Sequence, residues 1–172
     1  MSSTISVNSE GVINKPSLLK ALLLTGFVAG TLDMSGAIVV WSFVLQKITP
    51  LQILQGIASG VFGKEAFSGN LFIAASGVLF HYIIAFSFTT LYFLLCPRIP
   101  FLQNQKVISG LLYGIFAWAV MNYIVLPLSN VHMSPFKWFN AFISISILMV
   151  CLGLPISILT NRYYNNKEMI KA

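Results

Sequence analysis

Residues 21–45 read ALLLTGFVAGTLDMSGAIVVWSFVL, an apolar run long enough to span a bilayer, with one carboxylate near its middle. At 100° per residue, Gly26, Gly30, Asp33 and Ala37 fall within an arc of about 60° on a helix. Small residues let a second helix approach closely, and a carboxylate at mid-membrane costs roughly 2.5–3.5 kcal/mol on insertion scales. The stretch therefore predicts a membrane-spanning helix whose buried contact face is centred on Asp33.

The composition of the whole chain predicts a membrane protein. The chain has 172 residues, of which 57% are hydrophobic and only 8% are charged. A soluble domain carries about 25% charged residues, so most of this surface is expected to face lipid. The net charge of +6 is spread over the ends of apolar runs and forms no patch, which argues against nucleic-acid binding. The lipid bilayer is therefore the first expected partner.

Further apolar runs indicate an all-α, polytopic membrane protein with four transmembrane helices. The predicted spans are residues 21–45, 71–95, 108–129 and 142–160. They form one transmembrane domain at residues 17–165, and Pro155 is expected to kink the fourth span. The polar ends, residues 1–16 and 166–172, are expected to be cytoplasmic tails, the first of them disordered.

A fifth, shorter helix is predicted at residues 50–62, with Thr49 as its N-cap and a proline at its first position. At about 20 Å, this amphipathic helix is too short for a hydrocarbon core of roughly 30 Å. Two interpretations stay open. One is an interfacial helix with its polar face, Gln52, Gln55 and Ser59, in water, which the two-faced pattern favours; the other is a re-entrant segment buried by protein.

The distribution of basic residues predicts the orientation. Four spans place both termini on one side of the membrane. If that side is the cytoplasm, seven basic residues lie inside and three outside: Lys15, Lys20, Arg98, Lys106, Arg162, Lys167 and Lys171 against Lys47, Lys64 and Lys137. Because Lys and Arg concentrate in cytoplasmic segments, an N-in, C-in topology is predicted, with Trp41 and Phe43 in the aromatic belt of the outer interface.

Three short motifs follow one another along the first three spans: Gly26-x-x-Ala-Gly30, then His81 followed by apolar residues, then Gly110-Leu-Leu-x-Gly114 with Pro127-Leu128. In these motifs the chain resembles the YagU-type family of small bacterial inner-membrane proteins, which is associated with acid resistance. The resemblance implies an inner-membrane location and a role in acid or envelope stress. It extends to His81 and the glycines but not to Asp33 or the segment at 50–62, and it implies no chemistry.

Asp33 and His81 form a candidate intramembrane polar pair. Counted from the outer ends of their spans, they lie twelve and ten residues deep, which is about 18 and 15 Å. They are expected to face one another, either as a polar contact worth about 1 kcal/mol between two helices or as a proton or ion relay. The third alternative is that they do not meet. Asn122 is a further candidate, expected to bond to a neighbouring helix. The predicted helix-packing positions are Gly26, Gly30, Gly77, Gly110 and Gly114.

The sequence contains no motif for hydrolytic or nucleotide chemistry: it has no GxSxG, HExxH or P-loop pattern and no paired carboxylates. Cys96 and Cys151 have no cluster of ligand residues beside them in the sequence, so neither a metal site nor a disulfide is expected. We therefore expect a protein that is not an enzyme and uses no cofactor, and no small-molecule substrate follows from the sequence.

Two classes of function remain. The first is a non-enzymatic structural or stress-associated membrane protein of unassigned activity. The second is a small transporter or proton or ion pathway that uses the pair Asp33 and His81. A bundle of four spans has little room for an internal path, so transport would favour a homo-oligomer. A continuous polar cavity that reaches Asp33 favours transport, whereas a packed, dry pair favours a structural role.

Overall fold

The computed structural model describes residues 17–131 and 137–168, and these residues form helices and connecting loops without a β-strand. The predicted tail at residues 1–16 and the chain from residue 169 onward lie outside the described residues. Four helical segments are long and apolar enough to cross a membrane: Leu18–Val44, Leu71–Leu95, Lys106–Leu128 and Trp138–Asn165. The predicted all-α, polytopic fold is confirmed, and each span lies within a few residues of its predicted position.

Three of the four spans contain a π-helical turn. The first consists of α1 (Leu18–Ile38) and the π turn η1 (Val39–Val44), and the second is α3 (Leu71–Leu95). The third consists of α5 (Lys106–Val120), the π turn η3 (Met121–Val125) and α6 (Leu126–Leu128). The fourth consists of α7 (Trp138–Ile147), the π turn η4 (Leu148–Gly153) and α8 (Leu154–Glu168). The connections hold α2 (Pro50–Phe62), the 3₁₀ turn η2 (Gly63–Phe67) and α4 (Pro100–Asn104).

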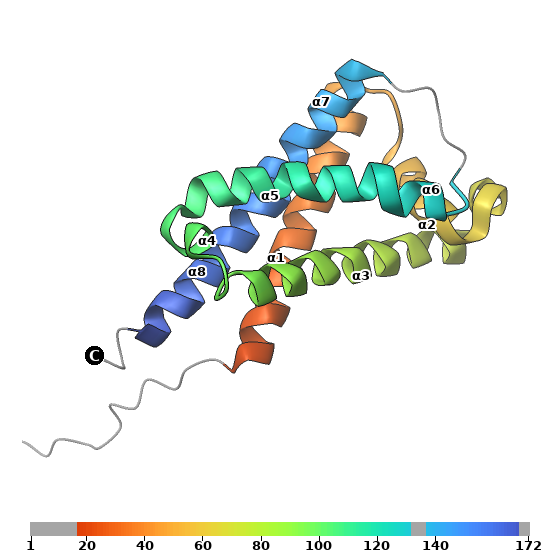
Figure 1. Ribbon diagram of the computed structural model, residues 1–172. Coiled ribbons are helices and arrows are strands. Elements are labelled where there is room, and N and C mark those ends of the chain that lie inside the picture. Colours follow the sequence, from red (N-terminus) through yellow and green to blue (C-terminus); the bar gives the residue numbers. More distant parts are fainter. Residues whose placement is uncertain (1–16, 132–136, 169–172) are drawn as a thin grey trace, which may run out of the picture.

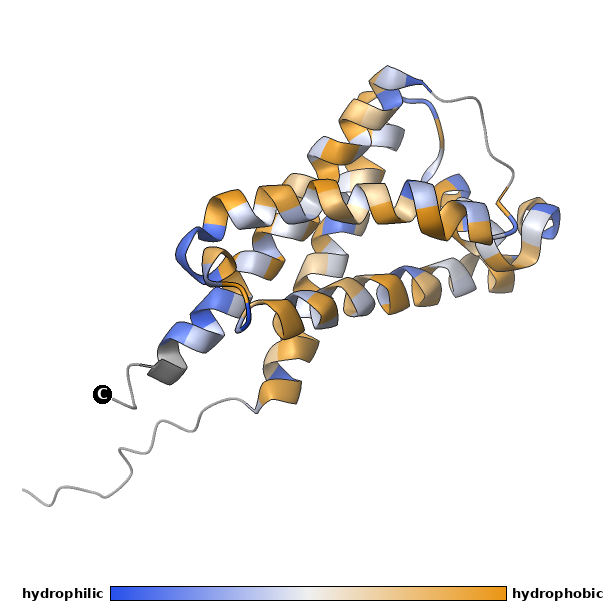
Figure 2. Ribbon diagram, viewed as in Figure 1, coloured by the Kyte–Doolittle hydropathy of each residue, from blue (hydrophilic) through white to orange (hydrophobic). Residues whose placement is uncertain are grey.

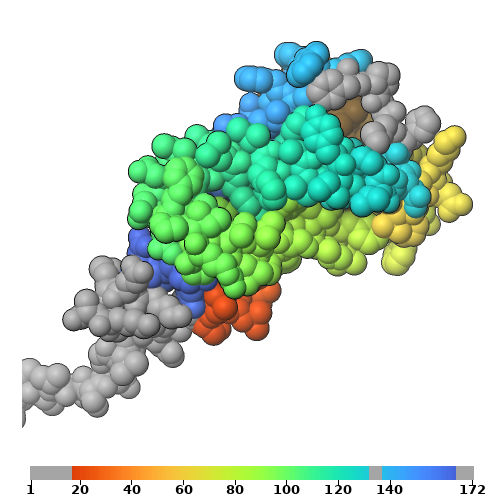
Figure 3. Space-filling model, in the orientation of Figure 1, coloured from red at the N-terminus to blue at the C-terminus, as the bar shows by residue number. Residues whose placement is uncertain are grey.

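The spans form two crossing pairs. The first and fourth spans run alongside one another, and α3 and α5 cross them (Figure 1). In the space-filling view α3 and α5 cover α1 and α8 (Figure 3). The start of α1 and the end of α8 lie at one end of the molecule, and α2 and η2 lie at the other. Polar residues gather towards these ends, with apolar residues between them (Figure 2), as expected for a protein that crosses a membrane.

The crossing of α5 with η4 is built on glycines. A Cβ atom added to Gly114 would overlap the backbone of Met149, and one added to Gly110 would lie 3.0 Å from the carbonyl oxygen of Gly153. Gly153 in turn faces the backbone of Gly110 and Gly114. The two helices therefore meet backbone to backbone, which only residues without a side chain permit. Gly153 is a member of this contact that the sequence motifs do not single out.

The small residues of α3 serve two different neighbours. Gly30 of α1 packs against Ala85 and Tyr82 of α3, where an added Cβ would come within 3.1 Å of both side chains. Gly77 of α3 faces the backbone carbonyl of Leu54 in α2 instead. Gly77, His81 and Ala85 lie on one face of α3, and this face is therefore divided between two neighbours. Its first part packs against α2, and its second part packs against α1.

The helix α2 has the predicted bounds and the predicted cap. Thr49 and Gln52 bond reciprocally, since the Gln52 amide donates to Thr49 Oγ1 at 3.3 Å and the Thr49 amide donates to Gln52 Oε1 at 2.8 Å. Two residues of the polar face expected in water, Gln55 and Ser59, are only 6% and 3% exposed, whereas the third, Gln52, is exposed. Gly77 of α3 lets the two helices approach to backbone contact at Leu54 of α2. Protein thus buries part of this segment, and both the interfacial and the re-entrant interpretations stay predictions.

Prolines explain two of the three π turns. Pro127 follows η3 and Pro155 follows η4. A proline within a helix has no N–H to donate to the carbonyl four residues earlier, and its ring crowds that carbonyl. A π turn widens the helix by one residue and moves the carbonyl away from the ring. The bend expected at Pro155 thus takes the form of the π turn before it.

Candidate functional site

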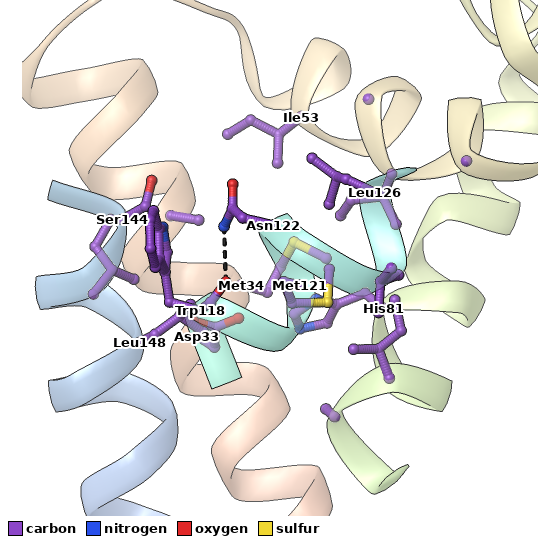
Figure 4. A pocket seen from close by; sticks show the side chains of 18 of the residues that line it. Asp33, Met34, Ile53, His81, Trp118, Met121, Asn122, Leu126, Ser144 and Leu148 are labelled. Carbon is purple, nitrogen blue, oxygen red and sulfur yellow. Dashed lines mark hydrogen bonds between the residues drawn. The ribbon is translucent and has the colours of Figure 1, made fainter. Parts of the chain in front are cut away.

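A cavity of about 570 Å³ lies between α1, α2, α3 and the parts of the third and fourth spans around η3, α7 and η4 (Figure 4). Each π turn contributes to its wall: Trp41 comes from η1, Asn122 from η3 and Leu148 from η4. Most of the wall is aliphatic or aromatic, and among the described residues that line it only Asp33 and His81 are ionisable. Its volume lies in the range of about 300–1,000 Å³ typical of small-molecule sites.

The carboxylate of Asp33 points into this cavity without a protein partner. Asp33 is half-buried, and no hydrogen bond or ion pair joins its side chain to any described residue. Its oxygens are not among the buried polar atoms that lack both a partner and accessible surface, so they are reached from the cavity. In the apolar interior of a membrane protein, such a group is costly unless something in the cavity neutralises it.

His81 is bound to the backbone of α1 and not to Asp33. Its Nε2 atom lies 2.8 Å from the carbonyl oxygen of Gly30, one helical turn from Asp33. A carbonyl can only accept, so Nε2 carries a proton, and in the neutral ring Nδ1 is left as an acceptor. His81 is still close enough to Asp33 for their charges to interact. The structure thus brings both residues to one cavity, but the direct hydrogen bond considered for them is not formed.

Asn122 does not make the interhelical contact expected from its sequence position. Its amide nitrogen donates to the carbonyl oxygen of Trp118 in its own helix, at 2.9 Å (Figure 4). Asn122 lies in the π turn η3, and the bond to Trp118 spans the junction between α5 and that turn. One of the two amide N–H groups is used within the helix, so the second N–H and the amide oxygen are left to meet a molecule in the cavity.

Two tryptophans of the wall are functional candidates that the sequence did not reveal. Trp41 is predicted for the interfacial belt, but it lines the cavity, and Lys47 lies over its ring at 5.5 Å. Lys47 also donates to the Asn140 side chain at 3.1 Å, which ties the end of the first span to α7. Trp118 lines the cavity from α5. The only sequence signal for Trp118 is its position one helical turn before Asn122.

A second polar cluster lies towards the end of the molecule that holds both termini of the described helices. The buried Tyr92 hydroxyl bonds to Ser109 Oγ at 2.9 Å and donates to Ser157 Oγ at 2.8 Å. Asn161 donates from its side chain to the carbonyl oxygen of Leu102 at 2.9 Å. These bonds join α3, α4, α5 and α8, and the hydroxyl groups satisfy one another. The cluster therefore holds this end closed, whereas the cavity lies towards the other end.

The described residues contain no group of three His, Cys, Asp or Glu side chains that could hold a metal ion. Comparison with protein-family models, with curated proteins and with solved structures finds no match to this chain. The resemblance to the YagU-type family therefore stays a prediction.

Proposed function

We propose that the chain is a small membrane transporter that holds its substrate in the cavity beside α2, with Asp33 as the charged contact. The observation that carries this proposal is the Asp33 carboxylate, which faces about 570 Å³ of space and has no bond to the described protein. Ionisable residues within membrane spans are rare, and they commonly mark substrate and ion pathways. The proposed activity is non-enzymatic binding and movement of a solute.

The arrangement of His81 favours transport over a purely structural role for the pair. Two residues that serve as a polar contact between helices are expected to bond to each other and to exclude space around them. His81 instead bonds to Gly30, and the space around Asp33 is open. We assign His81 a positioning role: its bond to the Gly30 carbonyl fixes α3 against α1 beside the carboxylate.

Water access to the cavity is tested with two serines of α7. Ser144 lines the cavity, whereas Ser146 is exposed on the outer surface of the same helix, where its hydroxyl bonds to the Phe142 carbonyl. In a background with Cys96→Ala and Cys151→Ala, a membrane-impermeant thiol reagent should label Ser144→Cys at least tenfold faster than Ser146→Cys. A thiol must ionise in water to react, and lipid around residue 146 prevents this.

The side of the membrane on which the thiol reagent is added distinguishes a transporter from a cavity that is open to water on one side only. In oriented vesicles, a transporter should allow Ser144→Cys to be labelled by reagent on either side, with one side slower. A cysteine at 144 that reacts no faster than one at 146 would show that the cavity is closed to water and would remove the basis of the proposal.

We further propose that the protein lies in a bacterial inner membrane with both termini in the cytoplasm. Lys20, Arg98, Lys106 and Arg162 all belong to the end of the bundle that holds the start of α1, α4 and the end of α8. This clustering agrees with the positive-inside rule. A reporter fused to the C-terminus should be active only in the cytoplasm, and one inserted at residues 66–70 only outside. The opposite pattern would reverse the orientation.

A further inference from the structure

We infer that the cavity binds a lipophilic organic cation, which competes with a proton for the carboxylate of Asp33. This inference rests on the proposed function, since it names the substrate class of the same cavity. It follows from four properties of the wall: its one acidic group, its lack of a fixed cation, its few oxygen ligands and its aromatic side chains.

The charges of the wall select a cation. Asp33 is the only acidic side chain among the described lining residues, and no lysine or arginine lines the cavity with it. Lys47 is engaged with Asn140 and the rings of Trp41 and Phe139, beyond the wall itself. An anion would meet an uncompensated carboxylate, and a neutral ligand would leave the carboxylate unpaired. A cation removes the cost of burying that group.

The scarcity of oxygen ligands points to an organic ion. Calcium takes 6–8 oxygen ligands and magnesium requires an octahedral set, so either ion needs a dense group of carboxylates, carbonyls or waters. Here the side-chain oxygens of the described wall are those of Asp33, Gln52, Asn122, Ser129 and Ser144, which come from five different elements or loops. Such a wall cannot replace a hydration shell. An organic cation has a weakly hydrated, apolar body that fits aliphatic and aromatic surroundings.

Trp118 supplies the aromatic contact for the ligand. Tryptophan is the aromatic side chain that attracts cations most strongly, and the attraction grows when water is excluded. One face of Trp41 is already under Lys47, whereas Trp118 contacts Tyr123 edge-on at 6.0 Å and has no cation over it among the described residues. Asn122, bonded to the Trp118 carbonyl, directs its amide oxygen to the same space and can accept from an N–H of the ligand.

A proton and the cation exclude one another at Asp33. When the cation binds, the carboxylate releases one proton, and when the cation leaves, one proton returns, so charge in the cavity is conserved. The ionisable groups that face Asp33 are His81 from α3 and the Cys151 thiol from η4. The residues of α2, α5, η3 and α7 that line the cavity are not ionisable. Lowering the pH therefore protonates the Asp33 carboxylate, and the loss of its negative charge opposes binding of a cation.

Equilibrium binding of tetraphenylphosphonium to the full chain in lipid nanodiscs tests the inference. We expect saturable binding that weakens as the pH falls, at least tenfold weaker binding by Asp33→Asn, and several-fold weaker binding by Trp118→Leu. Tetraphenylborate has the same shape and the opposite charge, so it should show no saturable binding. Ser35→Ala changes an exposed residue of α1 outside the cavity and should bind as the unchanged chain does.

The outcomes separate this inference from the proposed function. Equal binding of tetraphenylborate, or binding that Asp33→Asn leaves unchanged, would overturn the assignment of a cation, and the first of these comparisons needs no variant. Labelling of Ser144→Cys without saturable tetraphenylphosphonium binding would reject the ligand class and leave the cavity as a transport site. Failure of both experiments would reject both proposals.

Discussion

Replacement of Asp33 by leucine is expected to stabilise the ligand-free protein by about 1–2 kcal/mol and to abolish binding in the cavity. The carboxylate makes no hydrogen bond to the described residues, so its removal leaves no partner unsatisfied. A leucine side chain would instead contact the aliphatic wall of the cavity. The gain should stay below the roughly 2.5–3.5 kcal/mol that a mid-membrane aspartate costs on insertion scales, because Asp33 is only half-buried.

The measurement is unfolding of the purified protein in mixed micelles, followed by tryptophan fluorescence. Thr31→Val is the matched control, since it also changes a polar residue of α1 into an apolar one of similar size. Thr31 Oγ1 donates to the Phe27 carbonyl at 2.7 Å and lies 2.8 Å from the hydroxyl of Tyr82 in α3. Its loss should cost about 0.6 kcal/mol or more. If Asp33→Leu instead lowers stability by about 1 kcal/mol, the carboxylate is a structural contact and its role as a free ligand is excluded.

Replacement of Gly114 by alanine is expected to destabilise the protein by about 2–3 kcal/mol or more. The new methyl group would overlap the Met149 backbone and press on the carbonyl carbon of Leu148, and backbone atoms in a helix cannot move aside as a flexible side chain can. Overpacking in a tight core costs about 1–3 kcal/mol and sometimes more, and this contact lies where the α5–η4 crossing is closest. The same unfolding assay measures the change.

Gly56→Ala in α2 is the control for this prediction. An added Cβ at Gly56 meets no atom within 4 Å, so only the better helix propensity of alanine should act, with a gain of about 0.5–1 kcal/mol. Equal effects of the two substitutions would show that α5 and η4 do not meet backbone to backbone.

The sequence predicts the spans well because length and polarity decide them locally. A bilayer needs about 20 apolar residues, and the Thr49–Gln52 cap with a proline marks the start of α2 without ambiguity. The face that α2 turns towards the protein, in contrast to the spans, is not determined by local sequence. Its polar face is judged by composition alone, whereas the buried positions of Gln55 and Ser59 depend on the backbone contact between Leu54 and Gly77. A contact between residues 23 positions apart has no signal in either local pattern.

The candidate site is only partly predictable for the same reason. Asp33 and His81 stand out because ionisable groups are rare in apolar runs, and their similar depths follow from counting residues. The bond from His81 to the Gly30 carbonyl needs the register of two helices. Prediction of the cavity would require the relative positions of all four spans and α2, because residues from each of them form its wall. In the sequence, Trp118 therefore cannot be distinguished from the other apolar residues of its span, and only the structure identifies it as part of the cavity wall.

In each span that contains a π turn, the side chains before and after the turn point in directions that are set independently about the helix axis. A π turn holds one residue more than an α turn, so the part of the helix beyond it is rotated by about 100° relative to an uninterrupted α-helix. In the third span, the helix before η3 directs Gly110 and Gly114 to the fourth span, whereas the end of the turn and the residue after it, Val125 and Leu126, line the cavity. Insertion or deletion of a single residue in such a turn redirects one half and leaves the other in place. A change in η3 can therefore move Val125 and Leu126 in the cavity wall while the glycine crossing and Trp118, which precede the turn, stay in place.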